Sequence, residues 1–295
     1  MVSEKEGFKG RLEMRGPMAD TGLVSVIIPT KNSARFLEAC IASVRSQTYT
    51  PIEIIVVDNA SDDGTWEIAQ RHADRAMRGG PERCAQCNAA ARAASGEFLY
   101  RVDADFTLDR GIVAEAVAAC ARGADAVCVP NRSDPTVSFW STVRDFERRM
   151  LDGEQVVVGA RFFRKRAFDA VGGFDEALVA GEDYDINNRL VAAGATIVWI
   201  VAEETHLGEP KTLAEIARKS YYYGYTFGPF LRKNRSKGVA QLSPLRLAYA
   251  RHWRDFVRHP GLAAGFMVMQ SVKYGCGAAG LAVSLFAGAR RGTAA

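Results

Sequence analysis

The sequence predicts an α/β fold with a mainly parallel central sheet flanked by helices. Three observations support this prediction: short β-branched runs, helical spacing of the apolar residues between those runs, and polar clusters where the runs end. Strands that alternate with helices of this length form parallel sheets covered on both faces, and ligands bind at the carboxyl ends of the strands.

Strands and helices alternate along the first part of the chain. Leu23 to Ile28 is a β-branched run that ends at Pro29, which is typical of a buried strand. Apolar residues at helical spacing predict a helix over 33–47. The same reasoning predicts strands at 52–57, 98–102, 126–129, 156–163 and 196–201, and helices at 65–73, 81–94, 111–121, 138–150 and 183–193.

The character of the sequence changes after His206. Residues 245–257 predict a basic amphipathic helix, and 261–289 are largely apolar with Gly275 and Gly277 in the middle. Each apolar half is shorter than the roughly 20 residues that a bilayer span needs, so we expect an interfacial or re-entrant hairpin. The alternative is a soluble helical pair that packs on the α/β domain.

Composition excludes some classes of function. The 295 residues are 48% hydrophobic and 24% charged, as in ordinary soluble proteins. A formal net charge of +4 without a dense Lys/Arg stripe argues against nucleic-acid binding. The basic region from Lys211 onward suits an anionic membrane surface.

The cysteines indicate a reducing compartment. The spacing of the six cysteines does not form a disulfide framework, and a chain of this length does not need one. Cys84 and Cys87 form a CxxC pair, but without a second Cys or His pair nearby a zinc site is not favoured. Residues 1–22 lack the apolar stretch of a signal peptide and predict a flexible leader.

Asp103-Ala104-Asp105 follows a predicted strand. On an extended chain, carboxylates at i and i+2 point the same way, so both can reach one cation. Hard oxygen ligands favour Mg²⁺ or Mn²⁺, which would neutralise a diphosphate. The segment therefore predicts a metal site at the edge of the sheet.

Several stretches in a fixed order resemble the inverting family-2 glycosyltransferases of GT-A fold. They are Val26–Asn32, Val56–Thr65, Ala94–Glu97 leading to Asp103–Asp105, Gly172–Glu176, and Gly181–Asp185. The resemblance spans about residues 23–207. It implies a GT-A catalytic domain over 23–210, with a nucleotide-binding half (23–110), an acceptor-binding half (111–210) and a C-terminal helical region (211–295).

The resemblance implies a nucleotide-binding role for six residues. Pro29, Thr30 and Asn32 would line the nucleoside pocket, and Asp58 would accept a hydrogen bond from the base. Arg83 would pair with the base or a phosphate, for which a guanidinium is well suited. Asp103 would contact the ribose.

The resemblance also implies the metal ligands and the general base. Asp105 would bind Mn²⁺ or Mg²⁺ directly, with Asp103 sharing the ion and His206 completing the coordination. Asp183 would take the proton of the acceptor hydroxyl. The alternative for Asp183 is a carboxylate that caps a helix N-terminus.

Trp140, Gly181 and Glu182 fall in the region that shapes the acceptor pocket in this family. Trp140 could stack on a sugar face or belong to the core. The sequence departs from the family at Cys87, where the subgroup with Gln86 and Asn88 has an arginine. A phosphate contact from that position is therefore in doubt.

The resemblance thus implies a metal-dependent inverting glycosyltransferase. It would move a sugar from a nucleoside diphosphate, UDP by default, to a hydroxyl or lipid-linked acceptor. The basic tail places it in the cytoplasm, peripheral on the inner face of the cell membrane. The alternatives are a non-catalytic nucleotide-binding or membrane-scaffolding module, and a nucleotidyltransferase. Residues 29–32 lack the glycine-rich phosphate loop that a nucleotidyltransferase would need.

Overall fold

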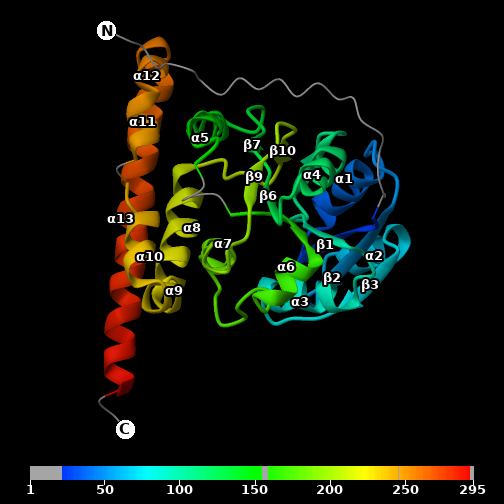
Figure 1. Ribbon diagram of the computed structural model, residues 1–295. Helices are drawn as coiled ribbons and strands as arrows, with labels where there is room; N and C mark the ends of the chain where they lie inside the picture. Colours follow the sequence, from blue (N-terminus) through cyan, green and yellow to red (C-terminus); the bar gives the residue numbers. More distant parts are fainter. Residues whose placement is uncertain (1–21, 155–158, 245, 293–295) are drawn as a thin grey trace.

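The structure is a computed structural model that describes residues 22–154, 159–244 and 246–292. The expected leader lies outside the described residues, apart from Gly22. An α/β domain occupies one side of the molecule, and the C-terminal helices run along the other (Figure 1).

A seven-stranded sheet forms the centre of the α/β domain, in the order β3-β2-β1-β4-β8-β6-β9. Neighbouring strands are parallel except for β8, which runs antiparallel to β4 and β6. The predicted mainly parallel sheet is therefore confirmed. Its strands are β1 (Val24–Thr30), β2 (Ile52–Asp58), β3 (Arg75–Arg78), β4 (Phe98–Arg101), β6 (Ala126–Cys128), β8 (Phe162–Arg164) and β9 (Ile197–Trp199).

Helices cover both faces of this sheet. Alternate residues of β1 point to opposite faces, so Val26 and Ile28 pack in one core cluster and Ile27 packs in the other. The first cluster includes residues of α1 and α4, and the second includes residues of α3 and α7. The helices of this domain are α1 (Ala34–Arg45), α2 (Thr65–His72), α3 (Arg83–Ala93), α4 (Ile112–Ala121), α6 (Lys165–Ala170) and α7 (Glu182–Ala192).

A second, three-stranded sheet lies beyond the end of β4. It contains β5 (Phe106–Leu108), β10 (Glu204–His206) and β7 (Asn131–Ser133), with β10 in the middle. His206 is paired with Phe106, the residue that follows Asp105. The small sheet therefore brings Asp105 and His206 together from positions far apart in the sequence.

The strand expected at 156–163 is misplaced. The observed strand is β8, and residues 155–158 lie outside the described residues. Pairing on both sides, with β4 and with β6, fixes β8 from Phe162 onward.

The C-terminal region is helical, as expected, but its arrangement differs from the prediction. The expected helix over 245–257 is two short helices that meet at His252, and residue 245 is outside the described residues. Together with α5, which lies between β7 and β8, the helices are α5 (Phe139–Met150), α8 (Leu213–Thr226), α9 (Gly228–Lys233), α10 (Arg235–Gln241), α11 (Leu247–Arg251), α12 (Trp253–Arg258) and α13 (Pro260–Gly292).

The expected apolar hairpin is wrong, because α13 is one continuous helix through Gly275 and Gly277. At Gly277 the helix approaches α8 closely, and a Cβ added at Gly224 would overlap the Gly277 carbonyl oxygen. Small residues here allow close helix packing and do not form a turn. Within the described residues, no helix is both long and apolar enough to cross a bilayer.

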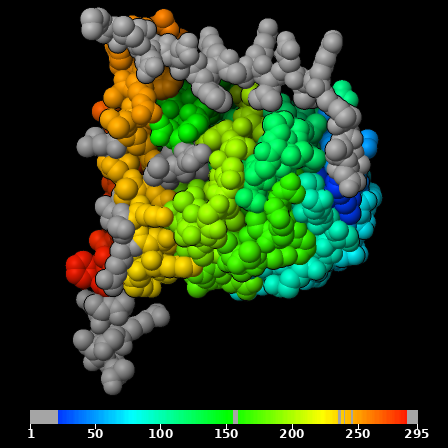
Figure 2. Space-filling view, viewed as in Figure 1, coloured from blue at the N-terminus to red at the C-terminus, as the bar shows by residue number. Residues whose placement is uncertain are grey.

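Helix α13 also packs against α5. Val143 and Met150 of α5 form a buried apolar cluster with Ile216 of α8 and Phe266 and Met269 of α13. Figure 2 shows the yellow and orange atoms of the C-terminal helices covering one whole side of the α/β domain. The C-terminal region is thus packed on the domain through its own apolar core.

Candidate active site

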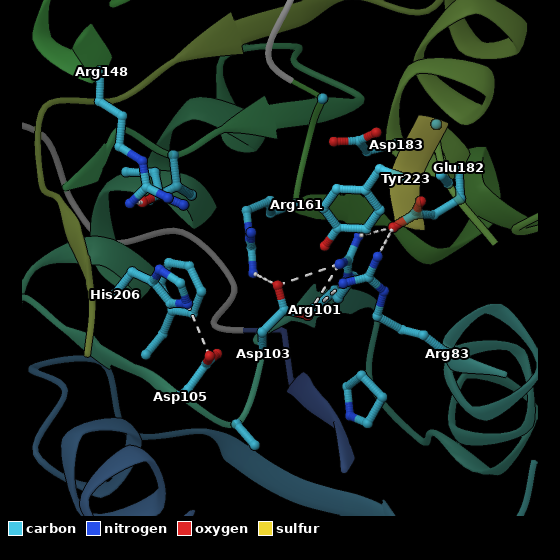
Figure 3. A pocket seen from close by; sticks show the side chains of 18 of the residues that line it. Arg83, Arg101, Asp103, Asp105, Arg148, Arg161, Glu182, Asp183, His206 and Tyr223 are labelled. Carbon is cyan, nitrogen blue, oxygen red and sulfur yellow. Dashed lines mark hydrogen bonds and ion pairs between the residues drawn. The ribbon is translucent and has the colours of Figure 1, made fainter. Parts of the chain in front are cut away.

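A cavity of about 690 Å³ lies where the strands of both sheets end. Its walls come from the end of β1, the segment after β4, helix α5, the start of α7, and helix α8 (Figure 3). Nine of the residues predicted for the site line it: Pro29, Asn32, Arg83, Asp103, Asp105, Gly181, Glu182, Asp183 and His206.

Asp103 is held by arginines. Its Oδ1 lies 3.0 Å from Arg101 Nη2, and its Oδ2 lies 2.9 Å from Arg161 Nη2. Burial alone would raise the pKa of Asp103, but these arginines and Arg83 hold the pKa well below its usual range. The carboxylate is therefore ionised and fixed in place.

The prediction that Asp103 and Asp105 point the same way is wrong. The chain turns at Ala104 and Asp105, with the Phe106 N–H bonded to the Asp103 carbonyl at 3.1 Å. The two side chains therefore diverge, and Asp105 turns toward His206 (Figure 3). Shared metal ligation by both carboxylates has no support in this geometry.

Asp105 and His206 form a pair on the cavity wall. Asp105 Oδ2 lies 2.8 Å from His206 Nε2, and the other ring nitrogen lies 2.7 Å from Glu209 Oε1. Burial lowers the pKa of His206, but its bonds to Asp105 and Glu209 outweigh burial and raise it. A Cβ added at Gly208 would overlap the Asp105 carboxylate, so a side chain there would force Asp105 to move.

Two adjacent protein donors fit a divalent cation that takes its remaining ligands from a diphosphate and water. Mg²⁺ is commonly held by one or two carboxylates plus substrate phosphates, and an imidazole nitrogen suits Mn²⁺. Among the described residues, no group of three or more Cys, His, Asp or Glu side chains could hold a metal by itself.

Glu182 is buried and lies between two arginines. Its Oε1 is 2.6 Å from Arg83 Nη2 and 3.6 Å from Arg101 Nη1. The expected acceptor contact of Glu182 is therefore at odds with the structure, because the arginines occupy its carboxylate. Ion pairs of alternating charge run along the cavity floor (Figure 3), in the order Arg83, Glu182, Arg101, Asp103 and Arg161.

Asp183 lies two residues after Gly181, which is the N-cap of α7 and has a φ of 80°. Asp183 Oδ1 accepts the backbone N–H of Tyr184 at 2.8 Å, so part of the helix-capping alternative also holds. Burial and the neighbouring Glu182 raise the pKa of Asp183, while Arg101 and that hydrogen bond oppose the shift. A carboxylate in this setting can accept a proton from a bound hydroxyl.

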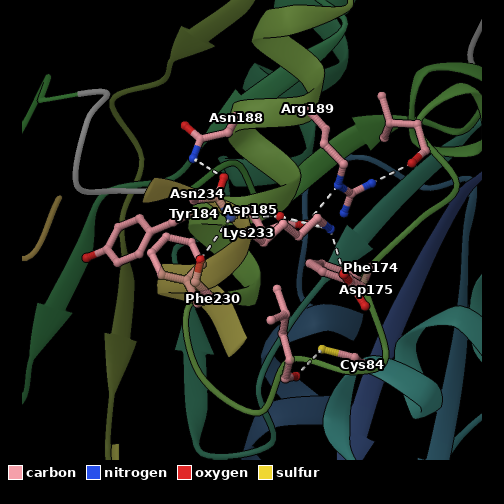
Figure 4. A network of polar contacts seen from close by, with 12 residues as sticks. Cys84, Phe174, Asp175, Tyr184, Asp185, Asn188, Arg189, Phe230, Lys233 and Asn234 are labelled. Carbon is pink, nitrogen blue, oxygen red and sulfur yellow. Dashed lines mark hydrogen bonds and ion pairs between the residues drawn. The ribbon is translucent and has the colours of Figure 1, made fainter. Parts of the chain in front are cut away.

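Asp185 supports the start of α7 from behind. Its carboxylate lies 2.8 Å from Arg189 Nε, 3.0 Å from Lys233 Nζ and 3.0 Å from Asn234 Nδ2 (Figure 4). Lys233 also bonds to Asp175 at 2.6 Å. This network joins α7 to the end of α9 through the buried Asp185 carboxylate.

Thr30 and Asp58 are buried beside the cavity and do not line it. The Thr30 hydroxyl donates to Asp58 Oδ1 at 3.3 Å, and Asp58 accepts from the backbone N–H and the hydroxyl of Ser61. Ser61 in turn accepts the Asn32 N–H at 2.8 Å. Asp58 therefore fixes the loop that positions Asn32.

Trp140 is half-buried and lines a smaller side cavity instead of the main one. Its ring packs edge-on against Phe139, with centroids 5.2 Å apart. It also packs on the apolar cluster shared by α5, α8 and α13.

Sequence reasoning missed several cavity residues. Arg101 and Arg161 carry charge into the core of the sheet, and Tyr223 of α8 projects into the cavity beside Asp183 (Figure 3). An arginine inside the apolar strand 98–101 was the available signal for Arg101. Cys87 is buried, and burial raises the pKa of its thiol to about 11. The cationic groups near this position are Arg101 and Arg83.

Comparison with known proteins identifies the family of this chain. Residues 25–171 match the family described as glycosyl transferase family 2. The succinoglycan biosynthesis protein ExoA of Rhizobium meliloti is 30% identical over 251 residues, which are 76% of this chain and 74% of ExoA. The chain belongs to glycosyl transferase family 2.

Other relatives match this transferase over a smaller part of their length. Chondroitin synthase of Escherichia coli is 25% identical over 184 residues, covering 58% of this chain and 27% of the synthase.

Solved structures share the GT-A fold. The mannosyltransferase PcManGT from Pyrobaculum calidifontis, in complex with GDP-Man and Mn²⁺, aligns with a TM-score of 0.62 at 19% identity. The alignment covers 89% of this transferase and 87% of the mannosyltransferase chain. S. aureus TarS 1-349 in complex with UDP-GlcNAc aligns with a TM-score of 0.50 at 17% identity, over 85% of this chain and 90% of its own.

Proposed function

We propose that this transferase moves a sugar from a nucleoside diphosphate to an acceptor hydroxyl with inversion, using Asp183 as the general base. The observation that carries the proposal is that Asp183 and the Asp103–Asp105 segment line one cavity. In this proposal the segment lies on the donor side of the cavity, and Asp183 lies on the wall that faces the acceptor.

The reaction follows from these positions. The acceptor oxygen attacks the anomeric carbon as Asp183 takes the hydroxyl proton. The bond between the anomeric carbon and the diphosphate oxygen breaks, and the diphosphate leaves with the electron pair. Attack opposite the leaving group inverts the anomeric centre and needs no covalent sugar–enzyme intermediate.

A divalent cation held by Asp105 and His206 would neutralise charge that develops on the leaving diphosphate. The chain's own contribution is to hold that pair in place. Gly208 leaves room for the Asp105 carboxylate, and Glu209 fixes the far side of the His206 ring.

The donor is expected to bind at the edge formed by Pro29, Asn32 and Arg83, all of which line the cavity. We infer a UDP-sugar, with a GDP-sugar as the alternative. The similar structures named above bind one of each kind. The similarity to a succinoglycan biosynthesis protein favours a hexose destined for a polysaccharide.

We also infer that the chain lies at a cytoplasmic membrane surface. Leu247, Trp253 and Val257 are exposed along α11 and α12, and the exposed Arg251, Arg254 and Arg258 alternate with them. Exposed apolar side chains among arginines are typical of helices that rest on anionic lipid.

Asp183→Asn tests the assignment of the base. We expect it to leave nucleotide binding intact and to lower transfer by at least about 100-fold, the usual contribution of a general base. Thermal stabilisation by UDP or GDP with Mn²⁺ would report binding, since stability rises with ligand concentration over Kd. It would also show which nucleoside is preferred.

The surface variant Asp169→Asn serves as the matched control, because Asp169 lies on α6, pairs with Lys165 and lines neither cavity. NMR of the product formed from an α-linked donor gives its anomeric configuration. Transfer that survives in Asp183→Asn would remove Asp183 as the base, and a retained α configuration would contradict inversion.

A further inference from the structure

Four cationic side chains surround a side cavity of about 120 Å³ that adjoins the main one. Arg144 and Arg148 come from α5, Lys219 from α8 and Lys273 from α13. Three of these cations, together with Tyr223, line both cavities: Arg144, Arg148 and Lys219.

The carboxylates near these cations do not balance them. Glu147 lies 2.5 Å from Arg144 and 2.8 Å from Lys273, and Glu209 lies 2.9 Å from Arg148. Glu209 is also shared with His206. Lys219 makes no hydrogen bond or ion pair with any residue in the described part of the chain. Four cations therefore face two carboxylates.

Three of the four cations, Arg144, Arg148 and Lys273, are partly buried. Burial and the neighbouring Arg144 lower the pKa of Lys273 to about 8 and that of Arg148 to about 10. Cations crowded in this way repel one another, and an anion placed among them would relieve the repulsion.

Apart from the cations, the side cavity is lined by Glu209, Ser220, Tyr223 and four apolar side chains. Trp140, Pro210, Ile216 and Met269 line it beside the cations. A ligand that fits this lining has a strongly anionic group next to an uncharged part. Phosphate and diphosphate esters have this character, and guanidinium groups bind their oxygens well.

The cluster lies away from the expected nucleotide edge. Its cations come from α5, α8 and α13, whereas Pro29, Asn32 and Arg83 lie at the ends of β1 and the start of α3. In Figure 3, Arg148 and Arg83 lie on opposite sides of the cavity, with Asp103 and Arg161 between them.

We propose that the side cavity binds a phosphate-ester group of the acceptor and so directs the acceptor hydroxyl into the main cavity toward Asp183. This inference rests on the proposed function, because it names the chemical class of the acceptor. Arg144, Arg148 and Lys219 would contact the phosphate oxygens, and Trp140 would pack on the adjoining part of the acceptor.

Direct binding tests the proposal without turnover. Octyl phosphate and the uncharged octyl β-glucoside serve as probes, titrated calorimetrically into the full chain. We expect octyl phosphate to bind at least ten times more tightly than octyl glucoside. Lys219→Gln should weaken octyl phosphate binding about fivefold and leave both octyl glucoside and UDP or GDP binding unchanged.

Lys219 is suited to this test because its side chain is exposed and has no partner to lose among the residues that the structure describes. Lys211→Gln is the matched control, since Lys211 is also exposed but lines neither cavity. Arg144→Gln provides a second variant, expected to weaken octyl phosphate binding more strongly than Lys219→Gln.

Three results would overturn the proposal. The first is equal binding of the charged and uncharged probes. The second is an unchanged affinity for octyl phosphate in both Lys219→Gln and Arg144→Gln. The third is a parallel loss of nucleoside diphosphate binding, which would assign the cluster to the donor.

Inorganic phosphate and pyrophosphate distinguish a water-soluble phosphate ester from a lipid-linked one. If they compete for the site and octyl phosphate binds no more tightly than they do, the acceptor is a water-soluble phosphate ester. Tighter binding of octyl phosphate indicates a lipid-linked one. Because the readout is binding, failure of Asp183 as a base would leave these results unaltered.

Discussion

The environment of Asp183 sets the pH range in which this side chain can act as a base. Burial and the charge of Glu182 raise its pKa above that of an ordinary aspartate. A base must be ionised to accept a proton, so activity falls as the pH drops through this pKa. The acid limb of the pH–rate profile is therefore expected above the range of about 3.9 typical of aspartate.

Glu182→Gln should move that acid limb to lower pH. The substitution removes one negative charge beside Asp183, and it leaves Arg83 and Arg101 to favour the ionised form more strongly. A shift of roughly one pH unit corresponds to about 1.4 kcal/mol. The measurement is the pH dependence of kcat at saturating donor and acceptor.

Glu67→Gln is the control, because Glu67 is exposed on α2 and lines neither cavity. An acid limb that stays in place in Glu182→Gln, or that moves equally in both variants, contradicts this role of Glu182.

Most of the predicted site residues do line the cavity, because their motifs follow strand ends and helix starts that meet at one edge. The direction of their side chains was harder to predict. The turn at Ala104 separates Asp103 from Asp105, and Glu182 is occupied by arginines. The directions of these side chains depend on contacts with Arg83 and Arg101, which come from other parts of the chain. A local sequence pattern does not reveal such contacts.

At the level of elements, α8 has two functions. Lys219 and Tyr223 line the main cavity, while Gly224 and Tyr221 contact α13. The position of the cavity wall therefore depends on how closely α8 and α13 approach each other.

Gly224→Ala should disturb this wall. The added Cβ would overlap the backbone of Gly277, so the two helices must separate. Overpacking of this kind costs about 1–3 kcal/mol. We expect a lower Tm together with a loss of transfer activity, because Tyr223 moves with the helix.

Gly275→Ala is the matched control on α13. Nothing lies within 4 Å of a Cβ added there, and alanine stabilises a helix interior by about 0.5–1 kcal/mol relative to glycine. This variant should keep its activity and gain a little stability. A Gly224→Ala protein that matches it in both respects would show that close packing of α8 on α13 is unimportant.

The long strands were predictable from the sequence, whereas several of the short ones were not. Strands β1 and β2 have seven residues each and are rich in valine and isoleucine. Strands β5, β7 and β10 have three residues each, too few to show a period. The hairpin prediction failed because glycine in a helix can serve packing as well as turning.

For the whole molecule, the proposed membrane contact depends on surface charge. Substituting Arg251, Arg254 and Arg258 together with glutamine should lower binding to phosphatidylglycerol vesicles at least tenfold. Each basic residue near such a surface contributes about 1 kcal/mol. Flotation with phosphatidylglycerol and with phosphatidylcholine vesicles measures the effect.

The control replaces Arg35, Arg71 and Arg122, which are exposed on the α/β domain, with glutamine. If both triple variants bind equally, or if wild-type protein binds neither kind of vesicle, the membrane proposal is lost. Deleting residues 244–295 would be a poorer test, because it would also uncover the apolar cluster of α5 and α8.

The close approach of α8 to α13 also bears on how chains of this family can be recombined. A chimera joined after residue 210 would take most of the cavity lining from one parent. It would take Lys219 and Tyr223 from the other parent. Helices α5, α8 and α13 share one apolar cluster, and Glu147 of α5 pairs with Lys273 of α13. An exchange of acceptor preference between relatives would therefore have to carry these three helices as a single unit.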